Sequence, residues 1–300
     1  MKKRYSKFRF SATTIVMSFL ALMLMLSGCT LEWELDNPAD SGNSSMMNSD
    51  RLRVIFLDVG QGASQLLISP SGKTMLIDGG NNDREQAMLD YLKQYGVTHL
   101  DIVIGTHPDA DHIGGLDRVI DHIDVGEIYM PKIQANTKTF ESLLLSIKNK
   151  GLKVKTAKAG LVLDWDEDIE VTMVGPLKAS DSKNNMSAVV KVVYGNTSYL
   201  LTGDAERESE RDMVESGADL RADVLLIGHH GSKSSSTLSF LKEVAPQYGV
   251  IQVGDNSYGH PTSTVLDRLR KQGIEVYRND LHGTVEIASD GYTYQITTER

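Results

Sequence analysis

Residues 105–115 read GTHPDADHIGG, and no other segment of the sequence is as informative. The segment follows the apolar run 99–104 (HLDIVI), which predicts a buried strand. It contains four candidate metal ligands, His107, Asp109, Asp111 and His112. In an extended loop, alternate side chains face the same way, and a residue that starts the next helix can turn toward the same centre. An exposed acidic turn with two incidental histidines is the weaker interpretation, so the segment predicts a metal site on a strand-to-helix loop.

The pattern around this loop alternates between strands and helices. We expect strands at 53–57, 65–68, 74–77, 127–130, 153–156, 169–174, 188–194, 197–201, 223–227, 248–253, 275–277, 283–288 and 293–297. We expect helices at 84–95, 139–150, 206–215, 236–244 and 263–271, and a further helix that ends near residue 122. Two similar halves of mixed strands and helices suit a sheet-on-sheet core covered by helices on both outer faces. We therefore predict one α/β domain over 51–300; two separate domains divided near 176–186 are the alternative.

Composition and charge narrow the class of protein. The chain has 300 residues, of which 40% are hydrophobic and 24% charged, which is typical of a globular protein with a core and excludes general disorder, collagen and a multi-span membrane protein. The formal charge is −9, and without the five positive charges of residues 1–28 it is −14. An acidic body argues against an extensive basic cradle for nucleic acid. The single cysteine excludes an intramolecular disulfide and a cysteine-based zinc cluster.

The N-terminus predicts export. A basic start is followed by the apolar run 14–26, which is shorter than the roughly 20 residues that a membrane span needs. Residues 26–29 (LSGC) resemble a bacterial lipobox, and the only cysteine, Cys29, stands where a lipobox requires it. We expect a signal peptide over 1–28, a lipid on Cys29 and a flexible tether over 29–50, which would anchor the protein to the outer face of a bacterial membrane. A plain signal peptide with an incidental cysteine is the alternative.

Five further motifs follow or precede strand patterns. They are DVGQG at 58–62, NNMS at 184–187, LLTGD at 200–204, LIGHHGS at 226–232 and SYGHP at 257–261. Together with residues 105–115, they resemble the metallo-β-lactamase superfamily, and specifically the hydrolase domain of ComEC-type competence proteins, over residues 52–290. The resemblance implies a four-layer αββα sandwich with metals at the edge between the two sheets.

The resemblance also implies a ligand set for two divalent metal ions. His107 and Asp109 would hold the first ion, Asp111 and His112 the second; Asp204 would bridge the two, and His260 would complete the second site. Two positions depart from the family pattern: Asp109 replaces a histidine, and the histidine of the third motif is missing, with Asn184 and Asn185 nearby. Both departures exchange nitrogen for oxygen, which favours manganese, with zinc as the alternative.

The remaining candidates are expected to support the metals or the substrate. Adjacent residues on a strand face opposite sides, so we expect only one of His229 and His230 to face the metals. By resemblance, His230 is predicted to protonate the leaving oxygen, and Asp111 is the second catalytic residue. We expect His229, Ser232 and Lys233 to contact the substrate, and Asp58, Asp78, Asn184 and Asn185 to support the ligands from behind. For Asp78 this means orienting a ligand histidine, with plain turn chemistry as the alternative.

These expectations define a function hypothesis. A dinuclear site polarises an ester or phosphoryl oxygen and lowers the pKa of bound water. The resemblance favours a phosphodiesterase or nuclease that acts on DNA or another phosphodiester, without a protein partner. The acidic body argues mildly against DNA, because phosphate contacts normally use Lys and Arg. One alternative is a hydrolase of a small ester, lactone or phosphocholine-type diester; the other is a lipoprotein that uses a degenerate metal site to bind a partner.

Overall fold

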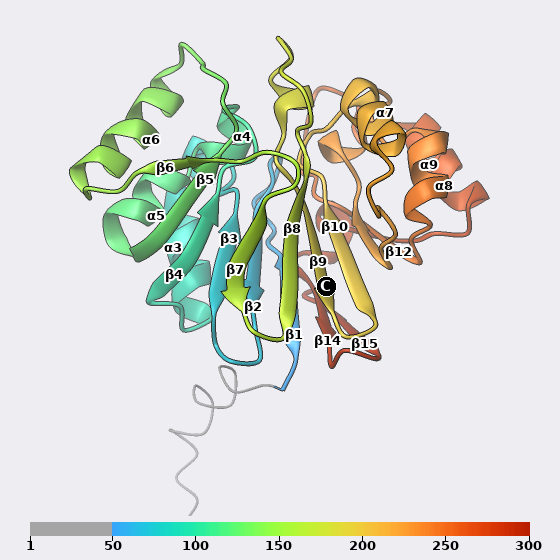
Figure 1. The fold of residues 1–300 in the computed structure, drawn as a ribbon, viewed down its shortest axis with the longest axis horizontal. Helices are drawn as coiled ribbons and strands as arrows, with labels where there is room; N and C mark the ends of the chain where they lie inside the picture. Colours follow the sequence, from blue (N-terminus) through green and yellow to red (C-terminus); the bar gives the residue numbers. More distant parts are fainter. Residues whose placement is uncertain (1–49) are drawn as a thin grey trace, which may run out of the picture. The chain divides into compact units, whose positions relative to one another are not determined.

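A computed structural model describes residues 50–300, and its framework is a pair of β-sheets packed face to face (Figure 1). The first sheet has eight strands, in the order β15 (Tyr294–Thr298), β14 (Val285–Ser289), β1 (Leu52–Phe56), β2 (Gln65–Ile68), β3 (Thr74–Ile77), β4 (His99–Ile104), β5 (Asp124–Met130) and β6 (Val154–Thr156). The second has seven, in the order β13 (Glu275–Arg278), β12 (Tyr248–Ile251), β11 (Val224–Leu226), β10 (Thr197–Leu201), β9 (Val189–Tyr194), β8 (Ile169–Gly175) and β7 (Val162–Asp166).

Helices cover the outer face of each sheet. In Figure 1, α3 (Glu85–Gln94), α5 (Leu116–His122) and α6 (Lys138–Asn149) lie on the first sheet, and α7 (Arg207–Ser216), α8 (Leu238–Val244) and α9 (Ser263–Lys271) lie on the second. Two short helices, α4 (Ala110–Ile113) and α10 (Asn279–His282), lie in connecting segments. The predicted αββα architecture is confirmed.

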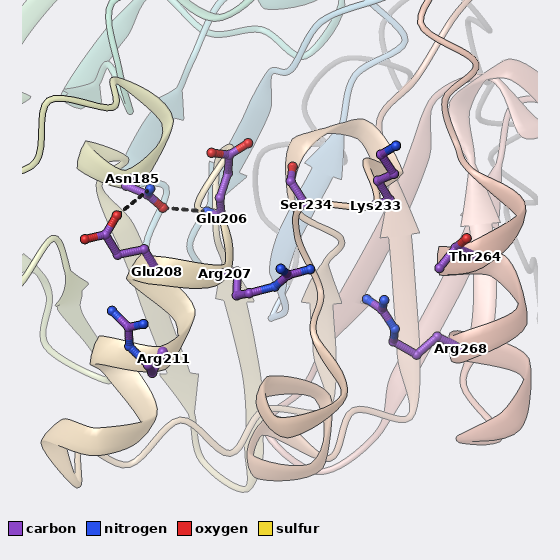
Figure 2. Close-up of a pocket in the computed structure, with 9 residues that line it drawn as sticks. All are labelled: Asn185, Glu206, Arg207, Glu208, Arg211, Lys233, Ser234, Thr264 and Arg268. Atoms are coloured by element: carbon purple, nitrogen blue, oxygen red, sulfur yellow. Dashed lines mark hydrogen bonds between the residues drawn. The ribbon is translucent and has the colours of Figure 1, made fainter.

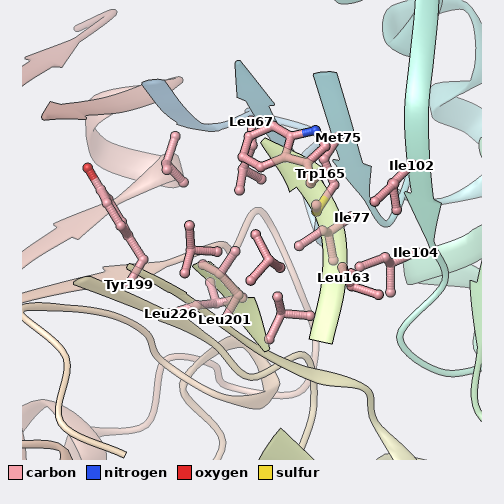
Figure 3. Close-up of a cluster of buried hydrophobic side chains, with 14 of the residues drawn as sticks. Leu67, Met75, Ile77, Ile102, Ile104, Leu163, Trp165, Tyr199, Leu201 and Leu226 are labelled. Carbon is pink, nitrogen blue, oxygen red and sulfur yellow. The ribbon is translucent and has the colours of Figure 1, made fainter. Parts of the chain in front are cut away.

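One apolar core fills the space between the two sheets (Figure 3). It includes Leu67 and Met75 from the first sheet and Trp165, Tyr199 and Leu201 from the second. Side chains alternate along β1: Val54 faces the second sheet, whereas Ile55 packs under the helices. Strands that are buried on both faces read as continuous apolar runs, which is why these strands were predictable.

The parallel parts of both sheets determine where the polar loops meet. β3, β4, β5 and β6 are parallel in the first sheet, and so are β10, β11, β12 and β13 in the second. Loops that follow parallel strands emerge at their carboxyl ends, where ligand sites of α/β proteins gather. The loops after β4, β10, β11 and β12 contain all four histidine and aspartate motifs predicted to bind metal or substrate.

Most predicted elements are present with boundaries within about two residues, but β7 and the short helix α10 were not predicted. The sequence of β7, VLDWD, alternates between exposed and buried side chains, and its two aspartates are unfavourable in strands. β7 lies at the edge of its sheet, where such residues are tolerated.

The predicted signal peptide, Cys29 and nearly all of the tether lie outside the described residues. Within 50–300, no helix combines the length and apolarity required to cross a bilayer.

Candidate metal centre

Three buried histidines converge on Asp204 at the edge between the two sheets. Nε2 of His112 lies 3.1 Å from Oδ1 of Asp204, while Nε2 of His107 and of His230 lie 3.9 and 3.8 Å from Oδ2. His107 and His112 come from the loop after β4, whereas Asp204 and His230 follow β10 and β11. The cluster therefore draws its side chains from both sheets.

Potential ligand atoms form two overlapping groups. One contains His107, His112 and Asp204, and the other contains Asp111, His112 and His230; within each group, the atoms lie within 4.8 Å of one another. His112 is common to both. Because the single lone pair on Nε2 of His112 can bind only one ion, the two groups are alternative assignments of His112 to neighbouring candidate metal positions.

Asp78 fixes the orientation of His112. This buried carboxylate lies at the end of β3, and its Oδ2 is 2.6 Å from Nδ1 of His112. Asp78 also accepts hydrogen bonds from the amide (2.8 Å) and hydroxyl (2.7 Å) of Thr106, which locks the start of the metal-binding loop. A carboxylate on Nδ1 leaves Nε2 available to a metal and raises the basicity of the ring. The position of Asp78 is that of an orienting residue.

His229 and His230 both face Asp204, which corrects the expectation that only one would. The segment is not a strand but a 3-10 turn, in which φ is 53° at His229, 54° at His230 and 81° at Gly231. Consecutive left-handed residues turn neighbouring side chains toward the same side, at a backbone cost that functional sites commonly bear. Nε2 of His229 consequently lies 3.6 Å from Oδ2 of Asp204.

The two adjacent histidines have different environments. His230 is buried, and its Nδ1 donates to the carbonyl of Gln252 at 2.7 Å, which directs the lone pair of Nε2 to Asp111, 3.2 Å away. The side chain of His229 is 23% exposed, and its Nδ1 lies 3.3 Å from Oε1 of Glu206. His230 thus has the geometry of a metal ligand, whereas His229 is a partly exposed imidazole next to a carboxylate.

The electrostatics of the cluster favour a bound cation. Burial alone would raise the pKa of the Asp204 carboxyl, but His112 and His230 hold it well below its usual range. Burial would likewise lower the pKa of His112, but Asp204 and Asp78 raise it well above the ordinary value. These carboxylates attract positive charge, and a divalent ion would take the place of the imidazole protons.

Unsatisfied atoms provide a direct test of whether a metal fits. Nε2 of His107, His112 and His230 is buried in each case and makes no hydrogen bond, although carboxylate oxygens face all three. Buried polar atoms without partners are rare in proteins and call for an explanation. Imidazole nitrogens and carboxylates around a common centre fit divalent metal ions.

Asp109 faces the cluster with only one of its two carboxylate oxygens. Its Oδ2 lies 3.6 Å from Nε2 of His107, but its Oδ1 pairs with Lys183, and its side chain is 30% exposed. His107 and Lys183 together lower the pKa of Asp109. Lys183 would therefore compete with a metal for this carboxylate.

The other predicted site residues lie at various distances from the cluster. The ring of His260 packs against that of His229, with centroids 5.5 Å apart, and its buried Nδ1 has no partner. Asn184 Nδ2 lies 3.4 Å from Nδ1 of His229. Asn185 accepts hydrogen bonds from the amides of Glu206 and Ser209 and so holds the start of α7.

Ser232, Lys233 and Asp58 do not contact the predicted ligands. The hydroxyl of Ser232 pairs with Ser234, and Lys233 is exposed on the rim of a neighbouring pocket. Asp58 accepts from the amide of Gly60 and forms an ion pair with Arg300, so the structure does not bring it into the cluster.

Three supporting residues were not predicted from the sequence. Thr106 connects Asp78 to His107, Lys183 pairs with Asp109, and Glu206 contacts His229. Thr106 and Glu206 stand next to or two residues after predicted ligands, and this proximity was the only available signal. Lys183 comes from a distant loop and could not be assigned without the fold.

Comparisons with known proteins identify the family of the chain. The model of the metallo-beta-lactamase superfamily matches residues 58–255. The chain is 32% identical over 253 residues to ComE operon protein 3 of Bacillus subtilis and 33% identical over 237 residues to competence protein ComA of Neisseria gonorrhoeae. Each alignment covers 78% of this chain and 32% of the relative, so the chain spans about one third of the length of these relatives.

A solved structure shares the fold at low sequence identity. CmlA, a diiron beta-hydroxylase from Streptomyces venezuelae, superposes with a TM-score of 0.53 over 80% of this chain and 54% of its own, at 14% identity. The resemblance to competence proteins is confirmed, and the likeness to CmlA concerns the fold alone. The matched residues include His107, His112, Asp204 and His230, and the chain belongs to the metallo-beta-lactamase superfamily.

Proposed function

We propose that this protein is a metal-dependent phosphodiesterase. The observation that carries the proposal is the convergence of three unsatisfied imidazole nitrogens on Asp204, with Asp111 beside them. Superfamily members are generally hydrolases, and the relatives named as competence proteins make a nucleic-acid phosphodiester the favoured substrate class. The carboxylates of Asp111 and Asp204 suit manganese, which pairs readily with phosphate, and the three imidazoles suit zinc, so both metals are to be tested.

The protein residues have separable tasks in this mechanism. Divalent ions bound by His107, His112, His230, Asp111 and Asp204 would polarise the phosphoryl oxygen and supply a nucleophile at neutral pH. Asp78 and Gln252 keep His112 and His230 oriented with Nε2 toward the centre. The buried position of the histidines excludes bulk water from the ligand atoms, which strengthens the electrostatic interactions there.

His229 is the best-placed residue to move a proton. Its imidazole is partly exposed beside Asp204, and Glu206 can hold Nδ1–H so that Nε2 exchanges a proton with the leaving oxygen. This proposal revises the tasks predicted for the two histidines. His230, predicted to donate the proton, would be a ligand, and His229, predicted to contact the substrate, would be the proton donor.

The experiment is hydrolysis of bis(p-nitrophenyl) phosphate, a single-stranded oligonucleotide and a lactone by protein loaded with manganese or zinc. We expect turnover of both phosphodiesters and its loss after chelation. Turnover of the lactone alone, with every divalent ion tried, would replace this proposal by a small-ester hydrolase. Metal binding without turnover of any substrate would favour the partner-binding alternative.

Two alanine variants test which of the two histidines binds metal and which donates the proton. His229→Ala should keep its metals and lose about 10²–10⁴-fold in turnover of the oligonucleotide, with a smaller loss for p-nitrophenyl esters, whose leaving group needs no proton. His230→Ala should instead bind less metal. The reverse pattern would restore His230 as the proton donor.

We also propose that the protein acts outside the cytoplasm, anchored to the membrane through Cys29. The support is the sequence of residues 1–29 alone.

A further inference from the structure

A separate cavity of about 740 Å³ opens beside the metal centre (Figure 2). Its lining includes four basic side chains, Arg207, Arg211, Lys233 and Arg268, and the hydroxyl-bearing Ser234 and Thr264. Two acids, Glu206 and Glu208, also line it, so positive charge exceeds negative charge here. This local excess is opposite in sign to the formal charge of the whole chain, which is −9.

The two central guanidinium groups face each other without an acid between them. Figure 2 shows Arg207 from α7 and Arg268 from α9 directed toward one another across the cavity. Among residues 50–300, neither makes an ion pair; Arg268 donates to the backbone carbonyls of Ser235 and Ser236, and the side chain of Arg207 has no hydrogen-bond partner. Two converging like charges repel, and an anion between them would remove that repulsion.

The acids of the lining are directed elsewhere. Glu206 lies against His229, and Glu208 accepts a hydrogen bond from the Asn185 amide. Arg211 has Asp212 at 3.8 Å as a weak partner. Buried Glu210, outside the lining, interacts electrostatically with Arg268. The charge of Arg207 is not paired with an acid among the described residues, and guanidinium forks are suited to phosphate oxygens.

This cavity is one side chain away from the metal cluster. Ser234 and Glu206 line the cavity, and their side-chain oxygens lie 3.4 and 3.3 Å from Nδ1 of His229. His229 in turn reaches Asp204 on its other side. A molecule bound at the metals could thus extend past His229 into the cavity.

We infer that Arg207 and Arg268 bind a second phosphate of the substrate, next to the one that is hydrolysed, so that the substrate is a polynucleotide strand rather than a small diester. The inference rests on the proposed function and specifies its substrate class. A lactone brings no anion to this cavity, and a phosphocholine-type diester would bring a cation that the two arginines repel. A strand carries a phosphate at every residue and can occupy both places.

The test measures KM of two variants, Arg207→Gln and Arg118→Gln, for two substrates. Arg118 is the control because it is an exposed arginine on α5, in the opposite layer. In Arg207→Gln, the factor by which KM increases should be about ten times larger for a single-stranded oligonucleotide than for bis(p-nitrophenyl) phosphate, which has one phosphate. The salt dependence of oligonucleotide binding should fall by about 0.7 in logarithmic slope for one lost phosphate contact. Arg207→Lys should restore part of the affinity, because it keeps the charge and loses the fork. Arg118→Gln should leave KM for both substrates unchanged.

A binding measurement separates this inference from the proposed function. Fluorescence anisotropy of a labelled oligonucleotide in the presence of EDTA does not require turnover, and Arg207→Gln should weaken binding about tenfold relative to wild type and Arg118→Gln. Equal binding by wild type and Arg207→Gln, or an equal change in KM for both substrates, would overturn the second phosphate site while leaving phosphodiesterase activity standing. Weaker binding by Arg207→Gln in a protein that hydrolyses no phosphodiester would overturn the proposed reaction and keep the phosphate site.

Discussion

Asp204 has the Nε2 atoms of four histidines within 3.9 Å, and no other carboxylate among residues 50–300 has a comparable set of contacts. Asp109, by contrast, faces one histidine and shares its charge with Lys183. If the centre holds two metal ions, Asp204 is placed to contact both, and Asp109 only one.

Substitutions of these two acids should therefore differ in metal content. Asp204→Ala should bind fewer equivalents of manganese than Asp109→Ala when both are dialysed against the metal and measured by elemental analysis. Asp204→Asn, which preserves the shape of the side chain and removes its charge, is the matched control for packing. Equal metal loss in Asp204→Ala and Asp109→Ala would contradict a bridging position for Asp204.

At this scale, the sequence predicted the residues at the centre of the cluster, but neither their orientation nor the absence of Asp58, Ser232 and Lys233 from it. His107, Asp111, His112 and Asp204 were recognisable because each follows a strand pattern. The left-handed turn at His229 was not recognisable, because left-handed φ values at non-glycine residues are uncommon and depend on the surrounding structure.

At the scale of elements, the short helix α4 depends on a close backbone approach. A Cβ at Gly114 would lie 2.3 Å from the amide nitrogen of Asn82 and 2.5 Å from the carbonyl oxygen of Ala110. Backbone atoms cannot give way as flexible side chains do, so α4, which contains Asp111 and His112, would have to move.

Gly114→Ala should accordingly destabilise the protein by about 1–3 kcal/mol and weaken metal binding. Gly217→Ala is the control. Gly217 ends α7 with φ 71°, and a Cβ there would meet no other atom, so the substitution should cost about 1–2 kcal/mol of stability through the left-handed backbone alone. Urea unfolding and metal titration of both variants would check this. Unchanged metal affinity in Gly114→Ala would show that α4 tolerates the shift.

Strands and helices were more predictable than the order in which they associate. β2, β3, β4 and α9 have the predicted boundaries because their apolar periodicity is uninterrupted. The pairing of β1 with β14 could not be inferred, because strand patterns do not identify partners that are distant in sequence.

At the scale of the whole molecule, Tyr199 connects the two sheets. It is buried on β10, and its hydroxyl donates to the carbonyl of Ile287 on β14 at 3.1 Å. Tyr199→Phe should lower the free energy of unfolding by about 0.5–1.5 kcal/mol without affecting metal content. Tyr292→Phe, at a side chain that is 78% exposed, should have no measurable effect in the same urea titration. Equal stability of all three proteins would mean that this hydrogen bond contributes nothing net.

The whole chain also has a predicted anchor. Cys29→Ala should move the protein from the membrane fraction to the soluble fraction, or stop its processing, because no other cysteine can accept the lipid. Fractionation and intact mass would check this, with Cys29→Ser as a second variant. An unchanged mass and unchanged membrane association would exclude lipidation at this position.

The pairing of β1 with both β2 and β14 has a consequence for biogenesis. Leu52 and Ser289 are register partners, so this part of β14 is synthesised 289 − 52 = 237 residues after its partner in β1. Until then, one edge of β1, with its unpaired amides and carbonyls, is open to pairing with other chains. Contacts between such distant residues slow folding, so we expect the nascent chain to be exposed to aggregation at this edge until β14 has been synthesised.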